Sequence, residues 1–256
     1  MLVGKVITSA SVFWPGTLEK ISAEQFMLSI RNQKILAVLR WAKYIDLQFS
    51  DFHVFIHLRM SGDLVIKEHP YSPEKHDRIV FTMEDGNFLV FNDTRKFGRV
   101  WLTSNPEDVI GNLGPEPFSP DFTPAELHAK LISHHRMIKP LLLDQSFLSG
   151  LGNIYSDEAL FLSKIHPQRN SDTINLDEAV RLYQAIQVVL NNGIEHNGAS
   201  IDWVYRGGSF QNHFHVYARE NQPCQFCGTP IIKIVVGQRG THFCPVCQPG
   251  IPSGHF

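Results

Sequence analysis

The segment from Pro223 to Gln248, PCQFCGTPIIKIVVGQRGTHFCPVCQ, contains all four cysteines of this 256-residue chain. The cysteines form two C-x2-C pairs on either side of a spacer, and this spacing is typical of zinc-binding ribbons. Each pair turns two thiolates toward one centre, and two pairs on a β-hairpin supply the tetrahedral sulfur set that Zn2+ prefers. The sequence therefore predicts one structural zinc ion, with the ligands Cys224, Cys227, Cys244 and Cys247.

The spacer between the cysteine pairs predicts the hairpin itself. IIKIVV is typical of a strand, Gly237 to Gly240 of a turn, and THF of the return strand, with Gln238 and Arg239 at the tip. Disulfides and a redox C-x-x-C are the alternatives for the cysteines. A secreted disulfide protein begins with a charged and then an apolar leader, whereas MLVGKVITSASVFW alternates like a strand. A redox motif needs only one pair, beside a βαβ unit.

Composition sets broad limits on the rest of the chain. With 43% hydrophobic residues, the chain can bury two modest cores and carry a metal-stapled module. It contains neither a targeting segment nor an apolar run long enough to cross a membrane, which favours a cytosolic protein. The net charge of −2 does not by itself indicate a nucleic-acid binder, so any basic patch must be local.

The hydrophobic pattern changes once along the chain. Up to about residue 104, short alternating segments such as KYIDLQFS and HVFIHLRM favour a mostly antiparallel sandwich or barrel. After the connector NLGPEPFSPDFTP, the spacing becomes helical: Thr123 should cap a helix from Pro124 to about His134, and Asn175 a helix that ends near Gly193. The predicted fold class is α+β.

The segment Gly150 to Tyr155, GLGNIY, is a glycine-containing turn that opens into a helix. Glycines let the backbone approach a ligand, and the helix N-terminus offers free N–H groups and the positive end of the dipole. Asn153 is expected to cap this helix and to donate a hydrogen bond to a phosphate. A tight connection between two helices is the simpler alternative for this turn.

Several motifs in one order carry a family resemblance. They are RWAKYIDL, IHLRMSGDL, EKHDRIVF, NDTRKFGRVW, NLGPEPF, LLLDQSFLSGLGNIYSDEALFLSKIHP, GGSFQNHFHVYARENQPC and the four-cysteine finger. From Val3 to Gln248, the chain closely resembles the bacterial formamidopyrimidine-DNA glycosylases of the Fpg/Nei family. The resemblance implies an antiparallel β-sandwich over residues 1–115, a helix-two-turn-helix domain over 116–205, and a lesion loop with a zinc-finger hairpin over 206–256.

The resemblance also implies an activity. The family removes oxidised purines, such as 8-oxoguanine and formamidopyrimidine, from double-stranded DNA by flipping out the base, and then nicks the abasic site by β- and δ-elimination. The implied partner is double-stranded DNA containing oxidised bases or abasic sites. The implied protein is a monomer of the bacterial cytoplasm, associated with the nucleoid.

Individual positions match the family's functional residues. Lys43 matches a lysine near the lesion, and Arg239 matches an arginine that grips phosphate and assists the second elimination. The matched DNA contacts are His76, Asn153, Met60, Arg95 and Phe97, the last three filling the gap that the flipped base leaves. By residue type alone, Met60 and Phe97 fit a hydrophobic core, and a lysine within an alternating strand is normally solvated. The histidines of QNHFHVY lie in the loop that the family places over the damaged base.

One part of the family pattern has no counterpart in this sequence. The family's nucleophile is an N-terminal proline with an adjacent glutamate, whereas Met1 to Gly4 matches the strand that follows them. Three explanations compete: a fragment or miscalled gene start, a form that binds damaged DNA or abasic sites without cutting, or a substitute amine from Lys43. The first is favoured, because loss of a covering helix would expose apolar surface. A zinc-ribbon module that acts on RNA or protein is a further alternative, against which the other motifs argue.

Overall fold

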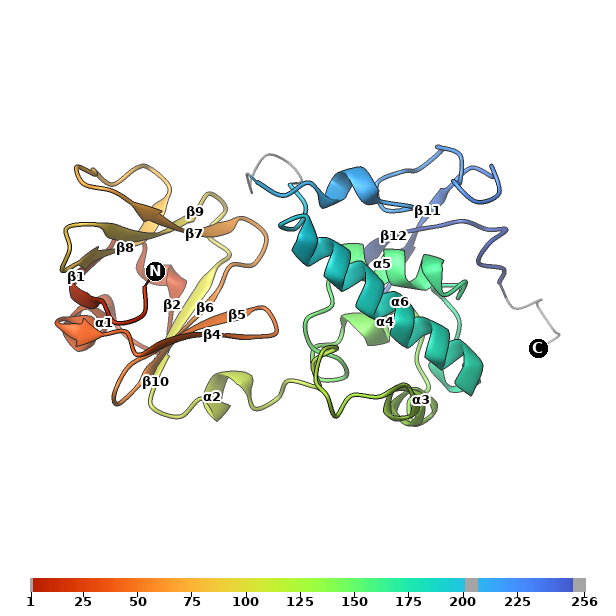
Figure 1. The fold of residues 1–256 in the computed structure, drawn as a ribbon, viewed down its shortest axis with the longest axis horizontal. Coiled ribbons are helices and arrows are strands. Elements are labelled where there is room, and N and C mark those ends of the chain that lie inside the picture. The colour runs from red at the N-terminus through yellow and green to blue at the C-terminus, as the bar shows by residue number, and fades with distance from the viewer. Residues whose placement is uncertain (1, 201–206, 251–256) are drawn as a thin grey trace. The chain divides into compact units, whose positions relative to one another are not determined.

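The chain divides into two compact units. The computed structural model describes residues 2–200 and 207–250. Contacts divide the chain into a sandwich unit, Met1–Asn112, and a helical unit, Leu113–Phe256 (Figure 1). Each unit has its own hydrophobic core. Within the described ranges, no helix is both long enough and apolar enough to span a bilayer.

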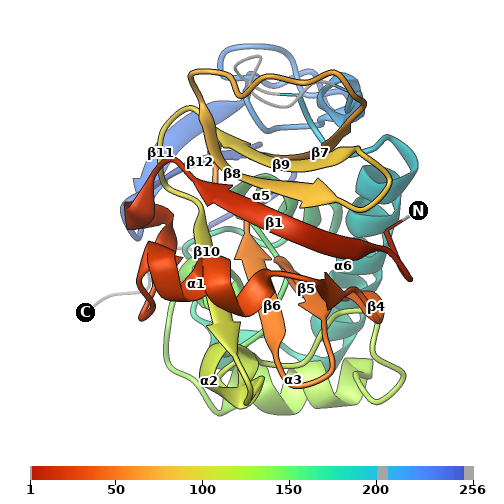
Figure 2. The ribbon, with the colours of Figure 1, turned by 90° about the vertical axis from the view of Figure 1, so that its left-hand side faces the viewer.

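The sandwich unit consists of two five-stranded sheets, with the strand orders β3-β1-β8-β9-β7 and β2-β10-β6-β5-β4. Neighbouring strands pair antiparallel except β2 and β10, which are parallel. Figure 2 shows the two layers, with α1 beside them. The elements are β1 (Val6–Val12), η1 (Pro15–Thr17), β2 (Leu18–Glu19), α1 (Ala23–Ile30), β3 (Gln33–Lys34), β4 (Ala37–Trp41), β5 (Tyr44–Gln48), β6 (His53–His57), β7 (Gly62–Lys67), β8 (Asp77–Met83), β9 (Phe88–Asp93), β10 (Arg99–Thr103) and α2 (Glu107–Ile110).

The core of the sandwich unit forms where the apolar faces of the sheets meet. Alternate residues of β8, Ile79 and Phe81, are fully buried, as the two-residue period of a strand requires. Helix α1 begins with a capping box between Ser22 and Gln25 and inserts Phe26 into the same core. The predicted antiparallel β-sandwich is thus confirmed.

Over its described residues, 113–200 and 207–250, the helical unit contains four main helices and a hairpin. Gly193 of α6 lies so close to Tyr155 of α5 that a Cβ at Gly193 would fall 2.5 Å from the tyrosine oxygen, so a glycine is required where these helices cross. The predicted caps Thr123 and Asn175 both accept a hydrogen bond from the backbone N–H three residues later. The elements are α3 (Pro124–Ile132), α4 (Ile138–Leu143), α5 (Asn153–Leu162), η2 (Ser171–Thr173), α6 (Leu176–Glu195), η3 (Phe210–His213), β11 (Ile232–Val236) and β12 (Arg239–Phe243).

The β11–β12 hairpin packs on α5 through a small apolar cluster in which Phe161 contacts the bases of the two cysteine loops. The hairpin turn is shorter than the sequence predicted. Gly237 and Gln238 alone form it, with φ of 56° and 63°, and Arg239 is already the first residue of β12, opposite Val236. Positive φ at both central residues matches the twist of a two-residue hairpin, which explains the short turn. The domain boundary expected at residues 205 and 206 lies outside the described residues.

Candidate nucleic-acid interface and zinc centre

The four cysteines converge at the base of the hairpin. Their Sγ atoms all lie within 4.8 Å of one another, and the nearest pair, Cys227 and Cys244, is 3.5 Å apart. Four thiolates at about 2.3 Å from a central zinc ion lie about 3.8 Å from one another. A disulfide requires about 2.05 Å between its sulfur atoms, so the disulfide alternative does not fit these separations. The donor set fits one structural zinc ion.

Backbone N–H groups and a glutamine complete the support of this centre. The N–H groups of Phe226 and Cys247 donate to the Sγ atoms of Cys224 and Cys244, both at 3.4 Å. Gln248 is fully buried. Its side chain accepts from the N–H of Cys244 and donates to the carbonyl of Ile165, at 3.0 and 2.9 Å. The second cysteine loop is therefore tied to the turn that follows α5.

A buried ion pair fixes the hairpin tip against the helices. Lys139 of α4 and Asp157 of α5 are both buried and form a salt bridge. Asp157 also accepts a hydrogen bond from the N–H of His242 at 2.9 Å, and the Nζ of Lys139 donates to the carbonyl of Gly240 at 3.1 Å. Burial lowers the pKa of the Lys139 ammonium, although Asp157 opposes the shift. One salt bridge thus connects α4, α5 and β12 next to the exposed Arg239.

Asn153 contributes to the same arrangement, but not as the predicted helix cap. The N-cap residue of α5 is Gly152, and it provides no side-chain cap. Asn153 is the first helical residue, and its Nδ2 donates to the carbonyl of Gly240 at 3.1 Å, because β12 passes directly over this end of the helix. The N–H groups at the start of α5 therefore have no side-chain cap, as an anion site requires.

A second buried carboxylate on α5 holds the chain segment that precedes the finger. Glu158 accepts hydrogen bonds from three consecutive N–H groups, those of His215, Val216 and Tyr217, at 2.8 to 2.9 Å. It also bonds to the Nδ1 atom of His215 at 3.0 Å. Sequence reasoning missed both this residue and Asp157. The available signal was two adjacent acidic residues inside an otherwise apolar helix, where a buried charge needs partners.

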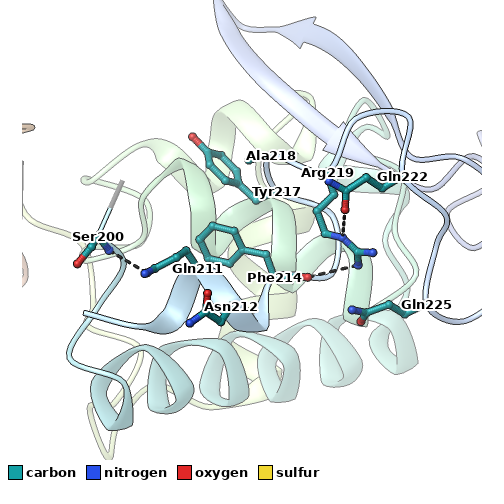
Figure 3. Close-up of a pocket in the computed structure, with 9 residues that line it drawn as sticks. All are labelled: Ser200, Gln211, Asn212, Phe214, Tyr217, Ala218, Arg219, Gln222 and Gln225. Atoms are coloured by element: carbon teal, nitrogen blue, oxygen red, sulfur yellow. Dashed lines mark hydrogen bonds between the residues drawn. The ribbon is translucent and has the colours of Figure 1, made fainter. Parts of the chain in front are cut away.

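An open polar pocket of about 530 Å³ adjoins this segment (Figure 3). Its arginine, Arg219, already donates hydrogen bonds to the Oε1 of Gln222 at 3.0 Å and to the carbonyl of His215 at 3.0 Å. The arginine therefore stabilises the turn and is not a free cation for a ligand. The lining residues are Ser200, Gln211, Asn212, Phe214, Tyr217, Ala218, Arg219, Gln222 and Gln225.

In the sandwich unit, Met60, Arg95 and Phe97 lie together on the surface. Met60 is 63% exposed and Phe97 50% exposed, so the alternative that these two residues belong to the core is wrong. The Nη2 of Arg95 donates to the carbonyl of Met60 at 3.2 Å, and the guanidinium lies 5.8 Å from the Phe97 ring centre. The structure thus places the Arg95 guanidinium against the backbone of Met60 and near the ring of Phe97.

His76 lies on a separate turn that precedes β8. It is half-buried, and its Nδ1 atom lies 3.4 Å from a guanidinium nitrogen of Arg78. The neighbouring Asp77 accepts hydrogen bonds from the hydroxyl of Tyr71 and the N–H of Glu74, both at 2.6 Å. Burial, together with the Asp77 carboxylate, raises the pKa of Tyr71. These bonds hold the segment that presents His76.

Lys43 lies in the turn between β4 and β5, and not within a strand as the sequence predicted. Ala42 adopts a φ of 52° there, which reverses the chain direction. The positive charge of Lys43 acts electrostatically on His57, which lies on β6. The pKa of His57 is lowered to about 4, first by burial and then by the positive charges of Arg59 and Lys43. His57 is therefore neutral at pH 7, and sequence reasoning did not identify it.

The pKa of His57 predicts how stability depends on pH. The unfolded chain binds a proton at His57 near pH 6.5, whereas the folded chain resists protonation down to about pH 4. The contribution of neutral His57 is therefore complete above pH 6.5 and is lost as the pH falls to 4. We expect His57→Gln to flatten this part of the curve of unfolding free energy against pH, measured by urea unfolding. His69→Gln, at an exposed histidine of the same unit, is the control. Equal slopes in the wild type and both variants would contradict the assignment.

Zinc removal should affect the two units differently. A chelator should unfold the β11–β12 hairpin, because four unpaired thiolates cannot close the two cysteine loops. The sandwich unit has its own core and should stay folded. Hydrogen exchange read at β11–β12 and at β8–β9 checks this, and restored protection of the hairpin on adding zinc back is the control. Hairpin amides that stay protected in zinc-free protein would rule out a structural zinc.

Family models match three consecutive parts of the chain. The model of the formamidopyrimidine-DNA glycosylase N-terminal domain matches residues 1–100. That of the formamidopyrimidine-DNA glycosylase H2TH domain matches residues 113–204. The model described as a zinc finger found in FPG and IleRS matches residues 221–250, which include the four converging cysteines. The predicted zinc finger is thereby confirmed.

Known proteins resemble the chain over almost its whole length. The formamidopyrimidine-DNA glycosylase of Herpetosiphon aurantiacus is 41% identical over 96% of this chain and 93% of its own length. That of Protochlamydia amoebophila is 42% identical over the same shares of the two chains. Solved structures of MutM with carbocyclic 8-oxo-G containing DNA, and of Lactococcus lactis Fpg with abasic site containing DNA, each share 34% identity and a TM-score of 0.90. Each match covers 97% of this chain and 94% of the other. This chain therefore belongs to the formamidopyrimidine-DNA glycosylase family.

Proposed function

We propose that this protein is a base-excision repair DNA glycosylase with AP lyase activity that removes oxidised purines from double-stranded DNA. The observation that carries the proposal is the exposed group of Met60, Arg95 and Phe97 on one surface of the sandwich unit. The names of the relatives, and the damaged or abasic DNA bound in the neighbouring structures, support the same conclusion.

The exposed group fits the physical problem of reaching a base inside a duplex. Extruding a nucleotide costs a few kcal/mol of stacking and pairing energy. Apolar side chains that enter the vacated space offset part of this cost. We assign the apolar filling to Met60 and Phe97, and the hydrogen bond to the unpaired partner base to the Arg95 guanidinium. The exposure of these two apolar side chains leaves them accessible for such contacts.

Phosphate contacts are proposed for the helical unit. The uncapped N-terminus of α5 offers backbone N–H donors, and the exposed Arg239 offers a guanidinium. The side-chain amide of Asn153 donates a hydrogen bond to the carbonyl of Gly240. We therefore propose that Asn153 fixes the position of Arg239 relative to the N-terminus of α5. We assign His76 to a further phosphate contact from the sandwich unit.

Of the three explanations for the missing nucleophile, the substitute amine is the one that residues of this chain can test, so catalysis is proposed for Lys43 and Arg239. An unprotonated Lys43 amine would add to C1′ of the deoxyribose as the base departs with the glycosidic electron pair and takes up a proton. The C1′–O4′ bond of this adduct then breaks and O4′ takes up a proton, which opens the sugar ring and gives an imine. The imine acidifies C2′ and permits β-elimination of the 3′ phosphate. Arg239 would neutralise the second phosphate as it leaves. Neutral His57 lies near Lys43 and adds no positive charge there at pH 7.

Borohydride trapping on defined duplexes tests this function. We expect the protein to release base from an 8-oxoguanine duplex and to nick an abasic duplex, with a covalent adduct that borohydride captures. The adduct should be lost in Lys43→Ala and kept in Lys34→Ala, the control at an exposed lysine on β3. Tight binding to an abasic duplex without base release would indicate a damage-binding protein. Equal affinity for damaged and undamaged duplex would refute both functions.

Arg239→Ala should weaken DNA binding about equally for all sequences. Removing one phosphate contact should also lower the slope of log K against log salt by about one. Fluorescence anisotropy between 50 and 200 mM salt measures this slope, and Lys233→Ala, at an exposed β11 residue, is the matched control. An unchanged slope in Arg239→Ala would exclude the phosphate contact.

We further propose that the protein acts as a monomer in the bacterial cytoplasm, at the nucleoid.

A further inference from the structure

We propose that Asp93 is a positioning residue for damage recognition, which holds Met60, Arg95 and Phe97 in one arrangement. The inference rests on the proposed function, because it assigns to Asp93 the placement of the three side chains that would fill the gap in the duplex. Asp93 is the last residue of β9, and its side chain is fully buried. It does not itself reach the surface on which these three side chains lie.

The Asp93 carboxylate joins two turns that are far apart in the sequence. Its Oδ1 accepts hydrogen bonds from the Ser61 hydroxyl and, at 3.2 Å, from the Arg95 N–H. Its Oδ2 accepts from the Gly98 N–H at 2.7 Å. The Ser61 hydroxyl oxygen also accepts from the Arg95 N–H, at 3.3 Å. One carboxylate therefore holds the residue after Met60, Arg95 itself and the residue after Phe97.

The backbone of Asp93 adds a third segment to this junction. Its N–H donates to the carbonyl of His76 at 2.9 Å, and its carbonyl accepts from the Nε of Arg78 at 2.7 Å. The neighbouring Asn92 donates to the Asp77 carboxylate at 2.8 Å. The end of β9 thus connects all three segments of the sandwich unit that carry the proposed DNA contacts His76, Met60, Arg95 and Phe97.

Two glycines lie in close contact with their surroundings at the end of β9. A Cβ at Gly98 would lie 2.4 Å from the Phe91 ring and 3.2 Å from the Oδ2 of Asp93. A Cβ at Gly62 would lie 2.5 Å from the carbonyl of Leu58. Gly62 is also the β7 residue paired with Asp93. Both turns therefore need a glycine at the point where they approach the end of β9.

The charge of Asp93 argues for a specific role. A buried carboxylate is unfavourable unless hydrogen-bond donors surround it, and a negative charge beneath a DNA-binding surface opposes phosphate binding. Each Asp93 oxygen accepts from backbone N–H groups, which need an acceptor and cannot rotate away. An asparagine of the same shape would direct its NH2 group at either Gly98 or Arg95, and one turn would lose its bond.

The test compares Asp93→Asn and Ser61→Ala with wild type and with a charge control. Asp85→Asn removes one carboxylate from the exposed turn between β8 and β9, away from the residues that Asp93 bonds. Two quantities are measured: the affinity for an abasic-site duplex relative to an undamaged duplex, and the fluorescence of 2-aminopurine placed next to the site. The fluorescence reports unstacking, which a role in folding alone would not change. Thermal unfolding is followed in parallel.

We expect Asp93→Asn to reduce the preference for the abasic duplex about tenfold, the effect of losing one hydrogen bond to a charged group. The 2-aminopurine signal should fall with it, while affinity for undamaged DNA should match that of Asp85→Asn. Ser61→Ala keeps the bond from Gly98 but also removes one hydrogen bond to the charged carboxylate, so it should reduce the preference by about tenfold as well.

The outcomes separate this inference from the proposed function. A wild-type protein without preference for the abasic duplex would refute the proposed function itself. A wild-type preference that Asp93→Asn keeps, together with the fluorescence signal, would overturn the role of Asp93 alone. If Asp93→Asn does not fold, Ser61→Ala decides the matter, and an unchanged preference in that folded variant would equally overturn the inference.

Discussion

The buried salt bridge between Lys139 and Asp157 is the interaction on which the helical unit depends. It joins α4 to α5, and both partners also hold the backbone of β12. An ion pair taken out of water is favourable only when further hydrogen bonds satisfy its remaining groups, and the carbonyl of Gly240 and the N–H of His242 supply them. The zinc ion closes one end of the hairpin, while this salt bridge fixes the end that presents Arg239. The two constraints together turn a short, otherwise marginal hairpin into a rigid support for one guanidinium.

Three buried carboxylates in the described part of the molecule accept hydrogen bonds from other segments of the chain. Asp93, Asp157 and Glu158 are all buried. Asp157 and Glu158 accept hydrogen bonds from N–H groups distant in the chain. Asp93 accepts from the hydroxyl of Ser61, 32 residues away, and from the N–H groups of the nearby Arg95 and Gly98. Each carboxylate lies at the end of a strand or within a helix, and the segments that it holds are turns or, for Asp157, the strand β12. The side chains proposed to meet DNA, such as Arg95 in a turn and Arg239 at the start of β12, therefore lie on backbone that a buried carboxylate holds in place. This arrangement keeps negative charge out of contact with phosphate while using its hydrogen-bonding strength.

Much of the site was predictable because its signals are local. The cysteine spacing predicted the zinc ligands, and the caps Thr123 and Asn175 predicted where α3 and α6 begin. Errors arose where a residue's neighbours come from elsewhere in the chain. Asn153 has the residue type of a helix cap, yet β12 lies close enough to take its amide. Lys43 follows an alternating pattern, yet a positive φ at Ala42 places it in a turn. The two-residue hairpin turn likewise depends on backbone angles that the sequence GQRG leaves open.

By itself, the sequence determined a mostly antiparallel sandwich or barrel, a helical unit and the four-thiolate finger, because strand alternation, helix caps and C-x2-C spacing each depend on a few consecutive residues. The family resemblance selected the sandwich. The family motifs added candidate side chains, but not their surroundings. Only the tertiary structure decided that Met60 and Phe97 are exposed and grouped around Arg95, and that His57 is held neutral beside Lys43. Exposure and pKa depend on what packs against a residue, and those neighbours lie tens of residues away. The role of Asp93 has the same origin, since its partners Ser61 and Gly98 meet only when β7 pairs with β9.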